Sequence, residues 1–193
     1  MMALIKRVRI AIGSLALLWG GISLASQAIA SEQAAWAALR QGAIVLFRHA
    51  DAPGTGDPPG FRLDDCATQR NLDARGRDQA AKVGERFQRE QIVVSTVLSS
   101  AWCRAFDTAI LAFPGQVRRE PSLNSFFDDR SQKAAQTNAA KAILVGWRGP
   151  GALVAVTHQV NIEALTGIAP APGEGVVLKS EQDELEVIGR IRP

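Results

Sequence analysis

Side chains that can do chemistry follow the apolar runs of this sequence, and the two histidines of the chain are the clearest case. Residues 43–47 form an apolar run that ends at Arg48 and His49, and residues 152–157 form another that ends at His158. The first run is short enough for a buried strand and too short for a lone helix. Open α/β sheets bind ligands beyond the carboxyl ends of their strands, so these groups are candidates for one site, although a solvated strand end is the ordinary alternative.

A third basic group follows a third apolar run. Residues 92–98 are rich in β-branched side chains and predict a buried strand, after which the period of the apolar residues becomes helical. Ser99 or Ser100 would cap this helix, which places Arg104 on its first turn. If the three strands are neighbours, two arginines and two histidines converge on one pocket.

Such a pocket suits a phosphoryl group. Arginine pairs with phosphate oxygens bidentately and keeps its charge, while a neutral imidazole can attack phosphorus. Neighbouring cations favour the unprotonated imidazole, and the amides of a helix N-terminus favour a bound anion. The alternation of predicted strands and helices indicates a three-layer α/β/α sandwich with a largely parallel central sheet.

Three segments carry a resemblance to a known family. RHA at 48–50, SSAWCRAFDTA at 99–109 and VTHQVNIEALTG at 156–167 occur in this order. They are similar to the signature blocks of the histidine phosphatase superfamily, which also contains the cofactor-dependent phosphoglycerate mutases. Each block alone is a weak signal, whereas three in the family's order across most of the chain make a strong one.

The resemblance implies a phosphoglycerate mutase-like fold and a phosphatase that hydrolyses phosphate monoesters. His49 would be the nucleophile that becomes phosphohistidine, and Arg48, Arg104 and His158 would hold the transferring phosphoryl group. It implies no metal and no cofactor. Two alternatives stay open: a catalytically silent phosphate-binding protein, and a metal site that joins both histidines to the two cysteines, whose spacing matches no zinc signature.

The proton donor is the position at which the sequence departs from the family. Many members carry a glutamate where this chain has Ser125, and serine is a poor acid for an alkoxide leaving group. We expect Asp128 to take this role, with Asp129 next and Glu163 after it, while two solvated loop aspartates are the plain alternative. Without an acid, substrates with good leaving groups, such as phosphohistidine or acyl phosphates, are favoured.

Four further polar residues are candidates around the pocket. Arg62 could reach the far end of a substrate, and Arg70 could do the same, although both also fit as solvated loop arginines. Gln159 follows His158 and is expected to bond into the pocket. Asn161 could do so too, or cap a helix.

The first 30 residues have the three parts of a secretory signal peptide. Lys6, Arg7 and Arg9 precede an apolar stretch at 10–24, and small residues at 28 and 30 fit a cleavage site. An uncleaved anchor helix is the alternative. We therefore expect a periplasmic or secreted protein that starts near Ser31 and has no membrane contact after cleavage.

Without its leader the chain is electrically balanced. The leader holds three of the 22 basic residues and none of the 19 acidic ones, so residues 31–193 carry 19 of each. This balance gives no support to nucleic-acid binding. The length of this segment fits a single histidine phosphatase domain.

Cys66 and Cys103 are the two cysteines of the chain. Export would place them in an oxidising compartment, and both fall in predicted loops beside the same strand ends. A disulfide between them is therefore expected, with two unpaired thiols as the alternative.

The remaining elements follow from periodicity and breakers. A long Pro- and Gly-rich loop at 51–70 is of the kind that is usually functional or disordered. We expect helices at 31–41 with Ser31 as N-cap, 71–91 with Asn71 or Asp73 as N-cap, 100–112, 134–147 and 162–165, an edge strand at 117–120, and a terminal strand pair at 176–178 and 185–191. Trp102 and Trp147 lie on helical stripes and are expected in the core.

The short loops leave no room for a large cap over the site, which predicts a shallow pocket. Such a pocket suits a bulky small-molecule ester or an envelope-attached one, including a phosphorylated sugar of the cell envelope.

Overall fold

The computed structural model describes residues 24–115 and 117–192. Within them the strands form a six-stranded sheet of order β3-β2-β4-β1-β5-β6. The strands are β1 (Ile44–Arg48), β2 (Val94–Ser99), β3 (Val117–Arg119), β4 (Ala152–Thr157), β5 (Gly175–Glu181) and β6 (Glu184–Ile191). β1, β2, β3 and β4 pair in parallel, and β5 and β6 add an antiparallel edge. The predicted strand neighbours and the largely parallel sheet are confirmed.

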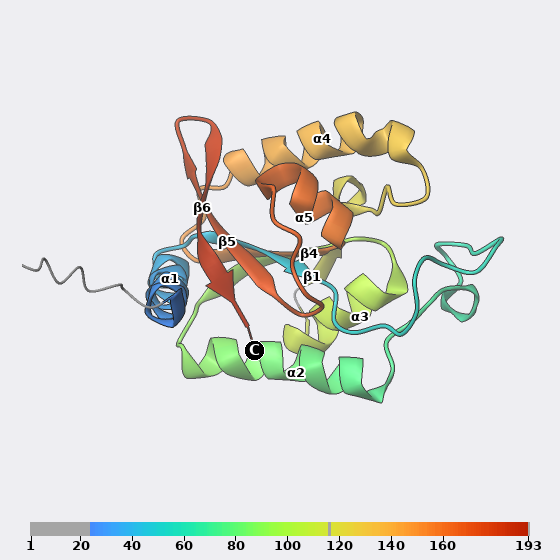
Figure 1. The fold of residues 1–193 in the computed structure, drawn as a ribbon, viewed down its shortest axis with the longest axis horizontal. Helices are drawn as coiled ribbons and strands as arrows, with labels where there is room; N and C mark the ends of the chain where they lie inside the picture. Colours follow the sequence, from blue (N-terminus) through green and yellow to red (C-terminus); the bar gives the residue numbers. More distant parts are fainter. Residues whose placement is uncertain (1–23, 116, 193) are drawn as a thin grey trace, which may run out of the picture.

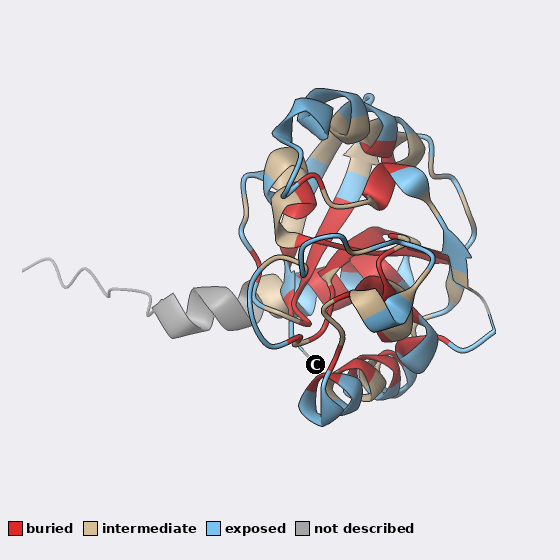
Figure 2. Cartoon of the chain, turned by 90° about the vertical axis from the view of Figure 1, so that its right-hand side faces the viewer, coloured by how far each residue is buried: buried red, intermediate tan, exposed pale blue. Residues whose placement is uncertain are grey.

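Helices cover both faces of this sheet (Figure 1). Side chains alternate between the faces of a strand, so Val45 and Phe47 pack with one set of helices, and Ile44 and Leu46 with the other. The helices are α1 (Leu24–Arg40), α2 (Ala74–Arg89) and α3 (Cys103–Ala112) on the first face, and α4 (Lys133–Val145) and α5 (Gln159–Thr166) on the second. Figure 2 shows burial concentrated in the sheet and on the helix surfaces that face it. The three-layer α/β/α prediction is confirmed.

The first helix starts earlier than predicted. Ser31 is an interior residue of α1 rather than its N-cap, because the alanine-rich sequence from residue 24 favours helix without a break. Most of the predicted signal peptide, residues 1–23, lies outside the described residues. In the part that is described, no helix has the length and apolar character needed to cross a membrane.

The helix after β2 also begins differently from the prediction. α3 starts at Cys103, and Trp102 holds the cap position without a side-chain hydrogen bond. Ser100 does not cap it in the expected way, because its hydroxyl lies 2.9 Å from Nε2 of His158. Arg104 still falls on the first turn, as predicted.

The long loop is anchored where it meets α2. Asp73 is the N-cap of this helix and accepts a hydrogen bond from the Gly76 amide at 2.8 Å. A Cβ at Gly76 would lie 2.0 Å from the carbonyl oxygen of Asp51, so only glycine permits this close approach. The start of the 51–70 loop is thereby packed against the helix that follows it.

Candidate active site

Three neighbouring parallel strands end at the same edge of the sheet and bring the predicted groups together. Arg48 pairs in register with Thr157, and Ser99 with Val156. His49 and His158 follow directly, and their ring centroids are 5.4 Å apart. The convergence predicted from the apolar runs is therefore present.

A cavity of about 230 Å³ lies at this edge. Both histidines line it and are only 4 % exposed. One wall comes from the 51–70 loop, and the other comes from residues 125–128; the lining residues from these two segments are Gly54, Thr55, Gly56, Asp57, Arg70, Ser125, Phe127 and Asp128. Figure 1 shows the 51–70 loop, in turquoise, extending beyond the ends of the strands.

The imidazole of His49 has a defined tautomer. Its Nδ1 lies 2.7 Å from the carbonyl oxygen of Ala50, which can only accept, so Nδ1 carries the proton and donates it. Nε2 therefore carries no proton, and its lone pair is available. Burial, together with the nearby Arg104, Arg70 and Arg48, lowers the pKa of His49 to about 3, against the opposing effect of the Ala50 hydrogen bond. At neutral pH this ring is an uncharged nucleophile.

His158 is held by the end of β2. Its Nε2 lies 2.9 Å from Oγ of Ser100, and the Trp102 ring packs against it at a centroid distance of 5.4 Å. Burial holds the pKa of His158 well below its usual range, and the neighbouring His49 and arginines add to this.

Arg48 is held by neutral acceptors. Its Nη1 donates to Oε1 of Gln159 at 2.7 Å and to the carbonyl oxygen of Pro170 at 3.0 Å. Gln159 was predicted to bond into the pocket, and it does so by orienting this arginine. Nε of Arg48 is buried and has no hydrogen-bond partner among the residues described.

Arg104 is held by a carboxylate. Its Nη1 and Nη2 donate to the two oxygens of Asp57 at 2.8 and 3.0 Å, and the side chains are 4 % and 1 % exposed. Nε of Arg104 is likewise buried without a partner in the described part of the chain. Sequence reasoning missed Asp57, because this residue comes from a loop without periodicity.

A sequence model described as histidine phosphatase superfamily (branch 1) matches residues 44–127, which include Arg48, His49 and Arg104. Over this segment the chain is similar to the histidine phosphatase superfamily. The comparison with curated proteins gives no match. His158 lies beyond the matched segment, and it is the sheet that brings this residue to the site.

Solved structures share the fold of this chain. The protein histidine phosphatase SixA complexed with tungstate has a TM-score of 0.57 and 16% identity, over 78% of this chain and 97% of that one. The alpha-ribazole phosphatase from Shigella flexneri has 0.55 and 17%, over 75% and 94%. The phosphoserine phosphatase from Entamoeba histolytica in complex with 3-phosphoglyceric acid has 0.56 and 13%, over 79% and 98%.

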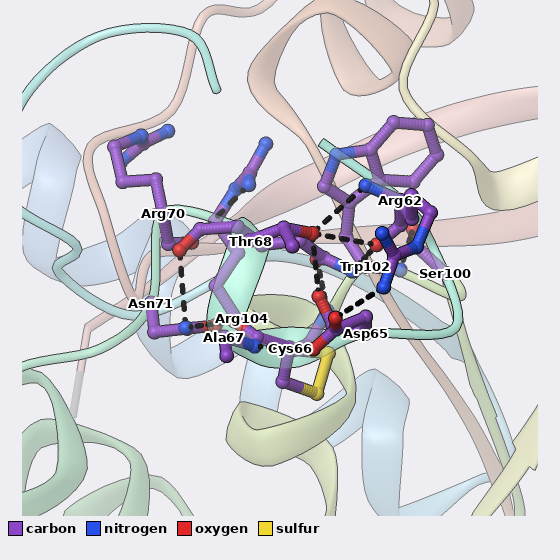
Figure 3. The surroundings of a disulfide bond; sticks show 12 residues. Arg62, Asp65, Cys66, Ala67, Thr68, Arg70, Asn71, Ser100, Trp102 and Arg104 are labelled. Carbon is purple, nitrogen blue, oxygen red and sulfur yellow. Dashed lines mark hydrogen bonds and ion pairs between the residues drawn. A yellow bond between two sulfur atoms is a disulfide. The ribbon is translucent and has the colours of Figure 1, made fainter. Parts of the chain in front are cut away.

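The two arginines of the long loop have different places in the structure. Arg62 was predicted to bind substrate, but it does not line the cavity; its guanidinium pairs with Asp65, and its side chain is 62% exposed (Figure 3). Arg70 does line the cavity, and its Nε donates to the carbonyl oxygen of Gly56 at 2.7 Å. The sequence left the two arginines equivalent, and only the folded loop shows that Arg70 lines the cavity and Arg62 does not.

The three candidate proton donors also differ in their positions relative to the cavity. Asp128 is exposed and lines the cavity, and Ser125 also lines it. Asp129 instead caps a short helical turn by accepting from the amide and hydroxyl of Ser131. Glu163 is exposed on α5 and is not part of the cavity lining.

The predicted disulfide between Cys66 and Cys103 is present, with a Cα–Cα distance of 5.7 Å (Figure 3). It joins the long loop to the first residue of α3, next to Arg104. Nearby, Oε1 of Gln69 accepts from the Cys103 amide at 3.0 Å. Since both sulfurs are used in this bond, neither is a thiolate for the alternative metal site.

Proposed function

We propose that this protein is a histidine phosphatase that hydrolyses phosphate monoesters through a phosphohistidine intermediate on His49. The observation that carries the proposal is the state of His49, a buried, uncharged imidazole with its Nε2 lone pair free, beside a second neutral histidine. A nucleophile of this kind needs no base to activate it.

The two arginines supply the reason for a phosphoryl ligand. Arg48 and Arg104 both line the cavity, and each has a buried Nε–H that meets no acceptor among the residues the structure describes. A buried charged donor without a partner is costly. Phosphoryl oxygens would satisfy both groups with charge-assisted hydrogen bonds and would explain their burial.

In the first step, Nε2 of His49 forms a bond to phosphorus while the bond from phosphorus to the ester oxygen breaks. The leaving oxygen carries off the electron pair of the broken bond and takes a proton. Arg48, Arg104 and His158 stabilise the charge on the transferring group.

In the second step, a water oxygen attacks phosphorus and the bond from phosphorus to Nε2 breaks. Orthophosphate leaves, and His49 recovers its lone pair. Asp128, at the open side of the cavity, would donate the proton in the first step and receive the water proton in the second.

A second candidate activity has its own support. Ser125 lines the cavity where many relatives would carry a glutamate, and Asp128 is exposed to water. A site with a weak acid favours phosphohistidine, other phosphoramidates and acyl phosphates, whose leaving groups depend less on protonation.

We further propose that the protein is exported and acts on a bulky or envelope-attached ester, such as a sugar phosphate. The leader pattern supports export, and the disulfide fits an oxidising compartment. The cavity walls are loops, and no further domain covers them in the described residues.

The test is a hydrolysis screen over phosphate monoesters and phosphoramidates with the wild type and His49→Ala. We expect His49→Ala to abolish turnover and an acid-labile phosphoprotein to form only on the wild type after rapid quenching. A wild type that binds orthophosphate but turns over no substrate would instead identify a silent binding protein. Activity that His49→Ala retains would contradict the proposal.

A further inference from the structure

Arg104 has five N–H groups, and the structure accounts for three of them. One on Nη1 and one on Nη2 go to Asp57, and the second on Nη1 goes to the carbonyl oxygen of Arg70 at 3.3 Å. The Nε–H and the second hydrogen on Nη2 meet no acceptor in the described part of the chain. These two lie on the same edge of a guanidinium and form a fork that matches two oxygens of a phosphoryl group.

Asp57 is itself fully engaged. One carboxylate oxygen accepts from Arg104 and from the Arg70 amide at 3.0 Å, and the other accepts from Arg104 and from Nε1 of Trp102 at 3.0 Å. Burial raises the pKa of Asp57, but these hydrogen bonds outweigh it and hold the pKa below its usual value. Asp57 is therefore an anion with no proton to give, which excludes it as the acid.

The loop around Asp57 is held so that this carboxylate has little freedom. Arg70 donates through its side chain to the carbonyl oxygens of Gly56 and Ala52, on either side of the turn that precedes Asp57. Further along, the disulfide ties the same loop to α3 next to Arg104. Both partners of the ion pair are thus fixed to one another by covalent and polar contacts.

We propose that Asp57 is a positioning residue that binds the Nη1/Nη2 edge of Arg104 and leaves the adjacent Nε/Nη2 edge for the phosphoryl group. The proposal rests on the proposed function for its catalytic consequence. It also predicts a purely physical effect, because an arginine that is oriented in advance loses less side-chain freedom when it binds an anion.

The experiment compares Asp57→Asn with Asp64→Asn. Both changes remove one carboxylate from the same loop, but the Asp64 side chain is 87% exposed and forms an ion pair with the exposed Arg62, outside the cavity lining. For p-nitrophenyl phosphate we expect Asp57→Asn to lower kcat/KM about 10- to 100-fold, and to weaken inhibition by orthovanadate by a similar factor. Asp64→Asn should stay within about twofold of the wild type, as a surface change of this kind does.

A double-mutant cycle shows whether Asp57 acts through Arg104. If it does, Asp57→Asn should cost no further activity in an Arg104→Ala background. An equal loss in both backgrounds would assign Asp57 to the general stability of the loop and overturn the proposal. Tighter orthovanadate binding and a lower KM in Asp57→Asn would also overturn it, because Asp57 would then compete with phosphate.

Two further measurements keep the outcomes distinct. Thermal unfolding identifies a variant that fails to fold, and Asp57→Glu, which restores the charge, should then recover part of the activity. If the wild type hydrolyses no ester, the proposed function fails, and calorimetry with orthophosphate tests the positioning role by itself. Equal orthophosphate affinities for the wild type and Asp57→Asn would refute it.

Discussion

The two walls of the active-site cavity are held in different ways. The 51–70 loop is tied down by a disulfide, by the buried pair between Asp57 and Arg104, and by the hydrogen bonds of Arg70. The 125–128 segment presents Phe127, which is 43% exposed, and Asp128, which is exposed to solvent. The 51–70 wall lies against Arg104, which would hold phosphoryl oxygens, and the 125–128 wall carries the candidate acid Asp128 on exposed residues. We infer that one side of the cavity sets the chemistry and the other admits different leaving groups.

The largest effect should come from removing the disulfide that anchors the 51–70 wall. The variant Cys66→Ser/Cys103→Ser removes a cross-link between positions 37 residues apart, and we expect the free energy of unfolding to fall by about 4 kcal/mol. Urea denaturation without reductant measures this. Asp129→Ala, which removes a turn cap next to the other wall, should cost much less, and equal losses would erase the contrast between the walls.

The two buried histidines between the walls should make the free energy of unfolding depend on pH. His49 and His158 are neutral when folded, while in the unfolded chain they bind protons below their ordinary pKa of about 6.5. The unfolded state therefore binds more protons as the pH falls from about 6.5 toward 3, and the free energy of unfolding should fall over that window by several kcal/mol. A His49→Asn/His158→Asn variant should show a flatter profile in chemical denaturation. An unchanged slope would contradict the buried, neutral state of both rings.

Replacing Arg70 should lower activity far more than replacing Arg62, which lies in the same loop. Arg70→Ala removes the bonds that hold the turn before Asp57, and we expect kcat/KM for p-nitrophenyl phosphate to fall about 10²-fold through misplacement of that wall. Arg62→Ala is the matched control, because its guanidinium is exposed and pairs with Asp65 outside the cavity. Comparable losses in the two variants would refute the placement of Arg62 outside the site.

In the exposed 125–128 wall, the effect of Asp128→Asn on kcat should depend on the leaving group. We expect kcat for alkyl phosphates to fall about 10- to 30-fold, less than for a buried acid because water at the open side also supplies protons. Phosphoramidate turnover should change little. Asp129→Asn is the control, since that carboxylate caps a turn. A uniform loss over both substrate types would remove Asp128 from the role of acid.

The smallest effect should come from Phe127→Ala. An exposed ring at the cavity wall contributes apolar contact to the leaving group, and we expect KM for aryl phosphates to rise about threefold while kcat stays unchanged. Leu63→Ala, at a similarly exposed position away from the cavity, should leave both constants unchanged. A large fall in kcat would contradict the inference that this wall only admits the leaving group.

Local patterns in the sequence were enough for the parts of the site that stand at strand ends. The apolar runs before His49, His158 and Arg104 set the strands, and parallel pairing then brings the groups to one edge. The pairing of Asp57 with Arg104 spans 47 positions and depends on how a loop without periodicity folds, so no spacing rule could reveal it.

The same limit explains the errors. Arg62 and Arg70 have equivalent sequence surroundings, and only the folded loop shows which one faces the cavity. Ser31 was a reasonable N-cap for an isolated segment, but the alanine-rich sequence before it continues the helix. Ser100 had cap chemistry, and its hydroxyl meets His158 instead because the strand register sets the two side by side.

The disulfide between Cys66 and Cys103 determines when, after synthesis, the protein can bind and hydrolyse its substrate. A newly made chain in a reducing cytosol keeps both thiols, so the segment that carries Asp57 and Arg70 has no permanent attachment to α3. If the chain is exported as we propose, its anion site reaches its final form only after translocation. Oxidation would then delay hydrolysis until the protein is separated from the metabolites of the cell that made it.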